Sequence, residues 1–104
     1  MLDIGQITTC LVNAEKRIDE AAYNFQRILF VGSATEDHKR ACRADMLICE
    51  QEARDFYAAA TAYGWTGDAE AEIAKHWQTY LPEASPDLLD KLRAKAREET
   101  ARSN

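Results

Sequence analysis

Four side chains that can bind a metal ion follow one another at helical spacing. His38, Cys42, Asp45 and Cys49 lie four, three and four residues apart, so one helix face would carry them all. The same spacing continues through apolar residues as far as Phe56. Structural zinc usually takes four ligands with closely spaced cysteine pairs, whereas a lone cysteine packs as a small hydrophobic residue. The pattern therefore favours a core face, and we expect Cys42 and Cys49 to be buried and free of metal.

His76 and Glu72 form a second candidate for chemistry, because a pair four residues apart on one helix could act in general acid–base catalysis or bind a ligand. The alternative, which we favour, is a half-buried histidine between Ile73 and Tyr80. The sequence contains no Glu-x-x-His di-iron pair, nucleophile elbow, Walker loop, His-Glu-x-x-His or dinucleotide fingerprint. We expect a protein that is not an enzyme and that takes no metal or cofactor.

The negative charge of the chain is concentrated in its middle. The net charge is −5 over 104 residues, and residues 45 to 74 carry seven acids against Arg54 alone. Most of these acids flank the expected turn near Trp65, where antiparallel helices would gather them at one end. We predict a partner-binding surface there, formed by Glu50, Glu52, Asp55, Trp65, Asp68, Glu70 and Glu72. The alternative is a set of solvated helix faces, with the acids near a helix start favoured by the macrodipole.

Other features of the composition exclude classes of function. Residues 87 to 104 carry five bases and four acids, so even the most basic stretch lacks the positive face of a DNA-binding domain. Direct nucleic-acid binding is not expected. No signal peptide pattern and no run of about 18 apolar residues occurs. The three cysteines are an odd number, which argues against a disulfide framework. We expect a cytoplasmic protein with no membrane association.

The elements that must position these residues are helices. In the first, expected over residues 4–31, apolar residues recur at spacings of three and four after Asp3 as N-cap. The second, over 34–63, begins after Ser33 and carries a matching stripe. Gly64 and Trp65 should close it in a Schellman-type cap. Thr66 should cap a third helix over 67–81. A fourth over 86–98 starts at Pro86, and residues 99–104 are expected to fray.

These elements predict one all-α domain spanning residues 1–104. The short link between the first two helices requires a long antiparallel helical hairpin, on which the two shorter helices pack in a bundle-like arrangement. A first helix of about 28 residues would be roughly 42 Å long, so the molecule should be elongated.

A second candidate contact face lies on the first helix, on the side away from the apolar stripe. Val12, Tyr23 and Phe30 point there at 100° per residue. Either the fourth helix covers them, or they form a contact with a second copy or another protein.

The leading functional hypothesis is a small acidic protein that binds another protein, one with a basic surface. Phages and mobile elements encode compact acidic helical proteins that block host nucleic-acid machinery, anti-CRISPR proteins among them. The comparison is one of size and charge, because no motif is matched residue by residue. The alternatives are a helical-hairpin homodimer acting as a structural adaptor, and a metal-binding helical bundle.

Overall fold

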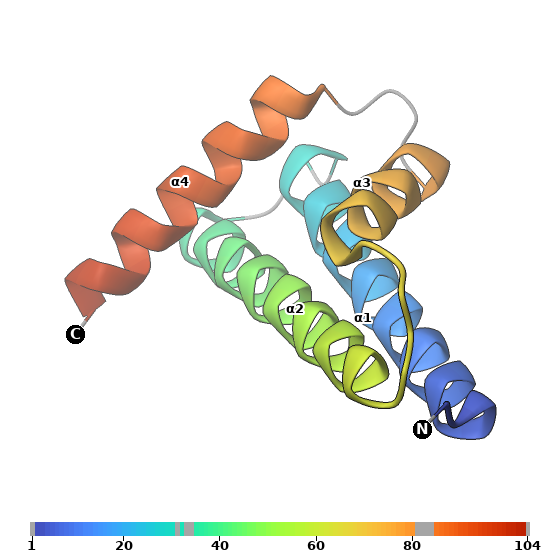
Figure 1. Cartoon of the computed structure of the whole chain (residues 1–104). Coiled ribbons are helices and arrows are strands. Elements are labelled where there is room, and N and C mark those ends of the chain that lie inside the picture. The colour runs from blue at the N-terminus through green and yellow to red at the C-terminus, as the bar shows by residue number, and fades with distance from the viewer. Residues whose placement is uncertain (1, 31, 33–34, 81–84, 104) are drawn as a thin grey trace.

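The computed structural model describes residues 2–30, 32, 35–80 and 85–103, apart from the side chains of Phe30, Tyr80 and Ser103. These residues form four helices and no strand: α1 (Ile4–Phe30), α2 (Glu36–Ala62), α3 (Ala69–Tyr80) and α4 (Pro86–Ser103). The helices α1 and α2 lie side by side as an antiparallel hairpin, and α3 and α4 pack on it (Figure 1). The prediction of an all-α, bundle-like fold built on a long hairpin is confirmed.

Two of the expected helix caps are present. Asp3 Oδ1 accepts a hydrogen bond from the backbone N–H of Gln6 at 3.1 Å, which satisfies a free amide in the first turn of α1. At the end of α2, Gly64 has φ +111°. The N–H of Trp65 donates to the carbonyl of Ala60 at 3.0 Å, and that of Gly64 donates to the carbonyl of Thr61 at 3.0 Å. This is the Schellman motif predicted from the sequence.

Two other helices begin later than predicted. The hydroxyl of Thr35 accepts a hydrogen bond from the N–H of His38 at 3.1 Å, so α2 starts at Glu36. Ser33, the predicted cap of this helix, and Val31, the predicted end of the first helix, lie outside the described residues. For α3, the cap is Asp68 and not Thr66. Asp68 Oδ1 accepts from the N–H groups of Glu70 at 3.0 Å and Ala71 at 3.2 Å. A carboxylate serves well here because it also meets the positive end of the helix dipole.

The core lies between α1 and α2, along the predicted stripes. Ile18 and Phe25 of α1 pack with Met46 of α2 and with small residues that let the two backbones approach closely. Cys42 and Cys49 are buried, as predicted. The stripe is not buried throughout, since Ile4 at the open end of the hairpin remains exposed. Trp77 of α3 covers the centre with its ring against Phe25, at 5.6 Å between centroids in an edge-on arrangement.

The last helix crosses over α2 (Figure 1) and continues to Ser103. The prediction that residues 99–104 fray is therefore wrong for the described residues up to Ser103. Glu99 accepts hydrogen bonds from Arg43 at 2.7 and 2.8 Å and from Arg40 at 3.2 Å, and these contacts hold the final turns of α4 against α2. Hydrogen bonds from Arg43 and then from Arg40 lower the pKa of Glu99 to about 2.

The molecule is elongated, as the length of α1 predicted, with extents of 49 × 33 × 20 Å. Within the part of the chain that the structure describes, no helix combines the length and the apolar character needed to cross a bilayer.

Candidate functional site

Glu50, one of the acids assigned to the predicted binding surface, is fully buried. Its carboxylate accepts a hydrogen bond from the indole N–H of Trp77 at 3.0 Å and from Arg93 at 2.7 to 3.2 Å. Including Glu50 in an exposed surface is therefore wrong. A carboxylate can be buried here because α3 and α4 supply donors for both of its oxygens.

The remaining predicted acids do not face one common surface. Glu70 forms an ion pair with Arg54 of α2 at 2.7 Å, on the side of the molecule where α4 lies. Glu72 lies 3.9 Å from His76, whose Nε2 is 3.3 Å from Glu15 on α1. Asp68 caps α3 as described above. These contacts spread the carboxylates over separate parts of the surface, and most of them have a partner inside the chain.

Two further members of the predicted surface lie on α2 and in the turn after it. Asp55 is exposed and accepts a hydrogen bond from Gln51 at 3.0 Å. Trp65 is partly buried, because its ring stacks on Tyr57 with 5.3 Å between centroids. The indole thus serves chiefly to close the end of α2, which is the role that its place in the Schellman motif gives it.

The structure gathers a different set of acids on the hairpin. Burial raises the pKa of the Cys49 thiol to about 11, and the negative charges of Glu52, Glu20 and Asp45 add to the increase. These three carboxylates, from both long helices, therefore lie near Cys49, which packs in the core of the hairpin. Arg17 opposes them and lies 3.6 Å from Glu52, as a solvent-accessible pair.

Ile48 stands among these acids on α2. It is 53% exposed, and Asp45 and Glu52 lie three residues before it and four residues after it, so they are its neighbours on the helix surface. We call the set Glu20, Asp45, Ile48 and Glu52 the acidic hairpin face. Only Glu52 belonged to the predicted surface.

The outer face of α1 is also open. Val12 is 43% exposed and Tyr23 is 56% exposed, with Arg27 stacked 5.5 Å from the centre of the Tyr23 ring. The expectation that the fourth helix could cover this face is wrong, because the described part of α4 packs on α2 and not on α1. The side chain of Phe30, the third predicted member, lies outside the described residues.

Of the four residues first considered as metal ligands, Cys42 and Cys49 lie in the core and His38 lies at its edge. Cys42 Sγ lies 3.8 Å from His38 Nε2, and that nitrogen is 2.6 Å from Arg27 Nη2, while Asp45 is exposed. Across the described residues, no three His, Cys, Asp or Glu side chains gather in a way that could hold a metal ion. A guanidinium beside the imidazole would also repel a cation.

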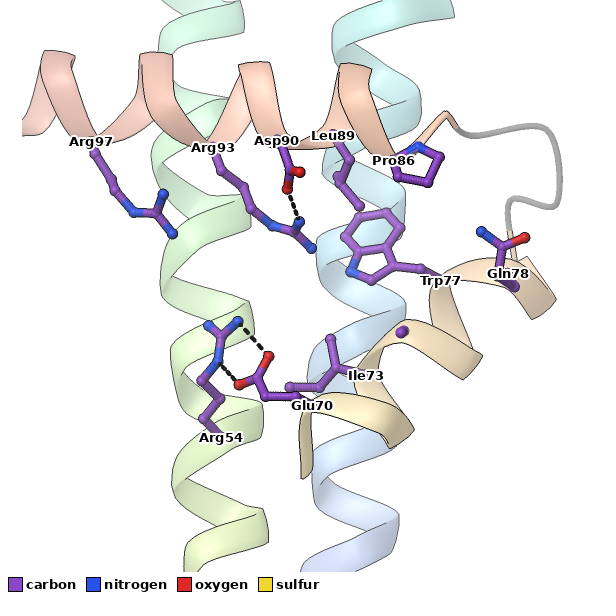
Figure 2. A pocket seen from close by; sticks show the side chains of 11 residues that line it. Arg54, Glu70, Ile73, Trp77, Gln78, Pro86, Leu89, Asp90, Arg93 and Arg97 are labelled. Carbon is purple, nitrogen blue, oxygen red and sulfur yellow. Dashed lines mark hydrogen bonds and ion pairs between the residues drawn. The ribbon is translucent and has the colours of Figure 1, made fainter. Parts of the chain in front are cut away.

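A pocket of about 390 Å³ opens between α2, α3 and α4. Figure 2 shows arginine side chains directed toward it from α2 (Arg54) and from α4 (Arg93 and Arg97), with Arg93 beside the indole of Trp77. The sequence analysis did not predict this pocket, because it did not identify the charged face of α2 that α4 covers. The feature of the sequence that could have indicated this face is the seven-residue spacing of three large side chains. These are Arg43, Glu50 and Tyr57, all of which are buried.

No family model matches the chain, and neither a curated protein nor a solved structure does.

Proposed function

We propose that this protein acts by binding another protein, one with a basic surface, through the acidic hairpin face. The observation that carries the proposal is the exposure of Ile48 between the carboxylates of Asp45 and Glu52, with Glu20 nearby on α1. An exposed branched apolar side chain flanked by carboxylates suits a contact that has an apolar centre and a charged rim.

The charges would act mainly on the rate and selectivity of association. Like-charged carboxylates on one face steer a basic partner toward it and repel acidic ones. Asp45 makes no ion pair within the described residues, and the Arg17–Glu52 pair is exposed and therefore weak. Contact with a partner would thus require little rearrangement of ion pairs already present.

The partner class that fits this chemistry best is a nucleic-acid-binding protein. Such proteins carry extended basic surfaces that neutralise phosphates. A small protein occupying such a surface would block access of the nucleic acid, which is the mode of action expected of a phage- or mobile-element-encoded inhibitor. This more specific form of the proposal rests on charge complementarity alone.

The test compares immobilised wild-type protein with the double variant Asp45→Lys/Glu52→Lys, using a lysate of the cells in which the protein occurs. A captured protein is identified by mass spectrometry, purified, and its association rate constant is measured at low and at physiological salt. We expect the variant to associate at least about tenfold more slowly at low salt, with a smaller difference at physiological salt because ions screen the charges.

The matched control is Asp87→Lys/Glu98→Lys, which makes the same charge change at exposed positions on α4. It should bind within about twofold of wild type, because its charges lie on another helix. Ile48→Ala tests the apolar centre and should speed dissociation. Equal association rates for wild type and the Asp45/Glu52 variant would rule out the acidic hairpin face as the binding surface.

One observation favours a second candidate, the structural homodimer. Val12 and Tyr23 remain exposed on the outer face of α1, where no other described helix covers them. Native mass at micromolar concentration tests this: a dimer that Tyr23→Glu converts to a monomer would support the adaptor function, whereas a monomeric wild type would exclude it.

A further inference from the structure

The pocket between α2, α3 and α4 combines an apolar wall with a cationic opening. Ile73, Trp77 and Leu89 are nearly fully buried side chains that border it, and Arg54, Arg93 and Arg97 bring three guanidinium groups to it (Figure 2). Its volume of about 390 Å³ lies in the range of small-molecule sites, which is about 300–1,000 Å³.

The wall of the pocket is held in place by one buried carboxylate. Glu50 accepts from the indole N–H of Trp77 at 3.0 Å and from Arg93 Nη2 at 2.7 Å, so a single group fixes both the aromatic ring and a guanidinium. A ligand that used these two residues would not have to order them first. Preorganisation of this kind reduces the entropic cost of binding.

Among the residues that the structure describes, the ion pairs around the pocket leave one positive charge without a partner. Arg54 pairs with Glu70, and Arg93 pairs with both Glu50 and Asp90. Arg97, by contrast, makes no hydrogen bond or ion pair with any other described residue, and its side chain extends from α4 on the same side as that of Arg93 (Figure 2). An acceptor from outside the chain is the natural partner for it.

The hydrogen-bond donors at the opening can serve such an acceptor. A guanidinium has five N–H groups. Arg54 bonds to Glu70 through Nε and Nη2. As far as the described residues are concerned, this leaves Nη1 of Arg54 available, together with all five N–H groups of Arg97. Glu70 and Asp90 also line the pocket, so a doubly charged anion would meet two carboxylates there. The charge balance therefore favours a ligand with a single negative charge.

We propose that this pocket binds a small organic carboxylate, with its apolar body against Trp77, Ile73 and Leu89 and its carboxylate at Arg97. The planar fork of arginine matches the two oxygens of a carboxylate. This proposal is independent of the acidic hairpin face, since the pocket lies beside α3 and α4 and shares no residue with that face.

The test titrates sodium benzoate into the full chain and follows the indole N–H signal of Trp77 by nuclear magnetic resonance. Benzamide has the same shape without the charge, and inorganic phosphate has charge without the apolar body. We expect a saturable shift with benzoate at millimolar concentration, and binding at least about fivefold weaker for both benzamide and phosphate, because each lacks one half of the interaction.

Two arginine variants on α4 form the matched pair. Arg97→Gln should raise the dissociation constant for benzoate by about fivefold or more, whereas Arg102→Gln, at an exposed position that forms an ion pair with Glu98, should leave it unchanged. Three results would overturn the proposal: no saturable shift up to about 50 mM benzoate, equal binding of benzamide, or equal binding by the Arg97→Gln variant.

Discussion

Individual residues decide how the two shorter helices attach to the hairpin. Glu50 is the most informative of them, because it is fully buried and yet charged, with Arg93 and Trp77 as its hydrogen-bond partners. Bringing a carboxylate into the core costs free energy, which its partners must offset. The energetic consequence of losing it therefore comes mainly from the groups that would be left without an acceptor.

We predict that Glu50→Ala lowers the free energy of unfolding by about 3–5 kcal/mol, since it leaves the indole N–H of Trp77 without its acceptor and leaves Arg93 with Asp90 as its remaining partner in a largely dry site. Urea denaturation measures this. Glu52→Ala is the control, because its pair with Arg17 is exposed and should contribute no more than about 1 kcal/mol. Equal losses for the two variants would mean that Glu50 is solvated in solution.

The sequence predicts apolar burial well and charged burial poorly, and the reason is physical. Ile18 belongs to the apolar stripe of α1, and Met46 and Cys49 belong to that of α2. Each stripe recurs at helical spacing within one segment, so it can be recognised from that segment alone. Burial of Glu50 depends on Arg93, which comes 43 residues later in the chain. No local pattern on α2 contains that information, so the acid was assigned to the surface.

At the scale of elements, α4 shows the same contrast between apolar contacts, which the sequence predicts, and buried charged contacts, which it does not. Its apolar stripe is short, with Leu89 and Ala96 as its buried members, and weak amphipathicity led to the expectation of a frayed end. The structure attaches its last turns through Glu99 to Arg43, which is 3% exposed. The helical hairpin, in contrast, was predictable because its stripes, the Asp3 cap and the Gly64 cap are all local signals.

The attachment of α4 should depend on pH through Glu99. Its pKa of about 2 in the folded protein lies below the ordinary 4.5, because Arg43 and Arg40 donate hydrogen bonds to the ionised carboxylate. The folded state therefore holds this proton less tightly than the unfolded state. The stabilisation is fully present above pH 4.5 and is lost as the pH falls toward 2.

We expect Glu99→Gln to lower the free energy of unfolding at pH 7 by up to about 3 kcal/mol and to flatten the loss of stability between pH 4.5 and pH 2. Urea denaturation at a series of pH values measures both effects. Glu98→Gln, at an exposed neighbouring position, should follow the wild-type curve. A Glu99 variant whose curve runs parallel to that of wild type would show that other carboxylates cause the acid sensitivity.

For the whole molecule, the position of α4 determines which surfaces stay open. Because α4 packs on α2, it encloses the arginine-lined pocket with α3 and leaves the outer face of α1 uncovered. The acidic residues flanking residues 63–67 were expected to form one end of the molecule. Their individual partners, such as Arg54 for Glu70, instead divide them among faces. Charge along a sequence thus predicted the presence of acidic surface but not its location.

The stability of the whole molecule should depend on the seam of the hairpin, by which we mean the buried apolar contact between α1 and α2. Both shorter helices pack on this hairpin. Ile18 lies at its centre and is fully buried, so Ile18→Asp places an unpaired carboxylate in the core. The cost of several kcal/mol is comparable with the total stability of a small domain, about 5–15 kcal/mol. We expect this variant to lose the helical circular dichroism signal at room temperature, with α3 and α4 unfolding together with the hairpin. Tyr23→Asp, on the exposed side of the same helix, should keep a melting temperature close to that of wild type. If Ile18→Asp melted as wild type does, the seam would not be the core of the protein in solution.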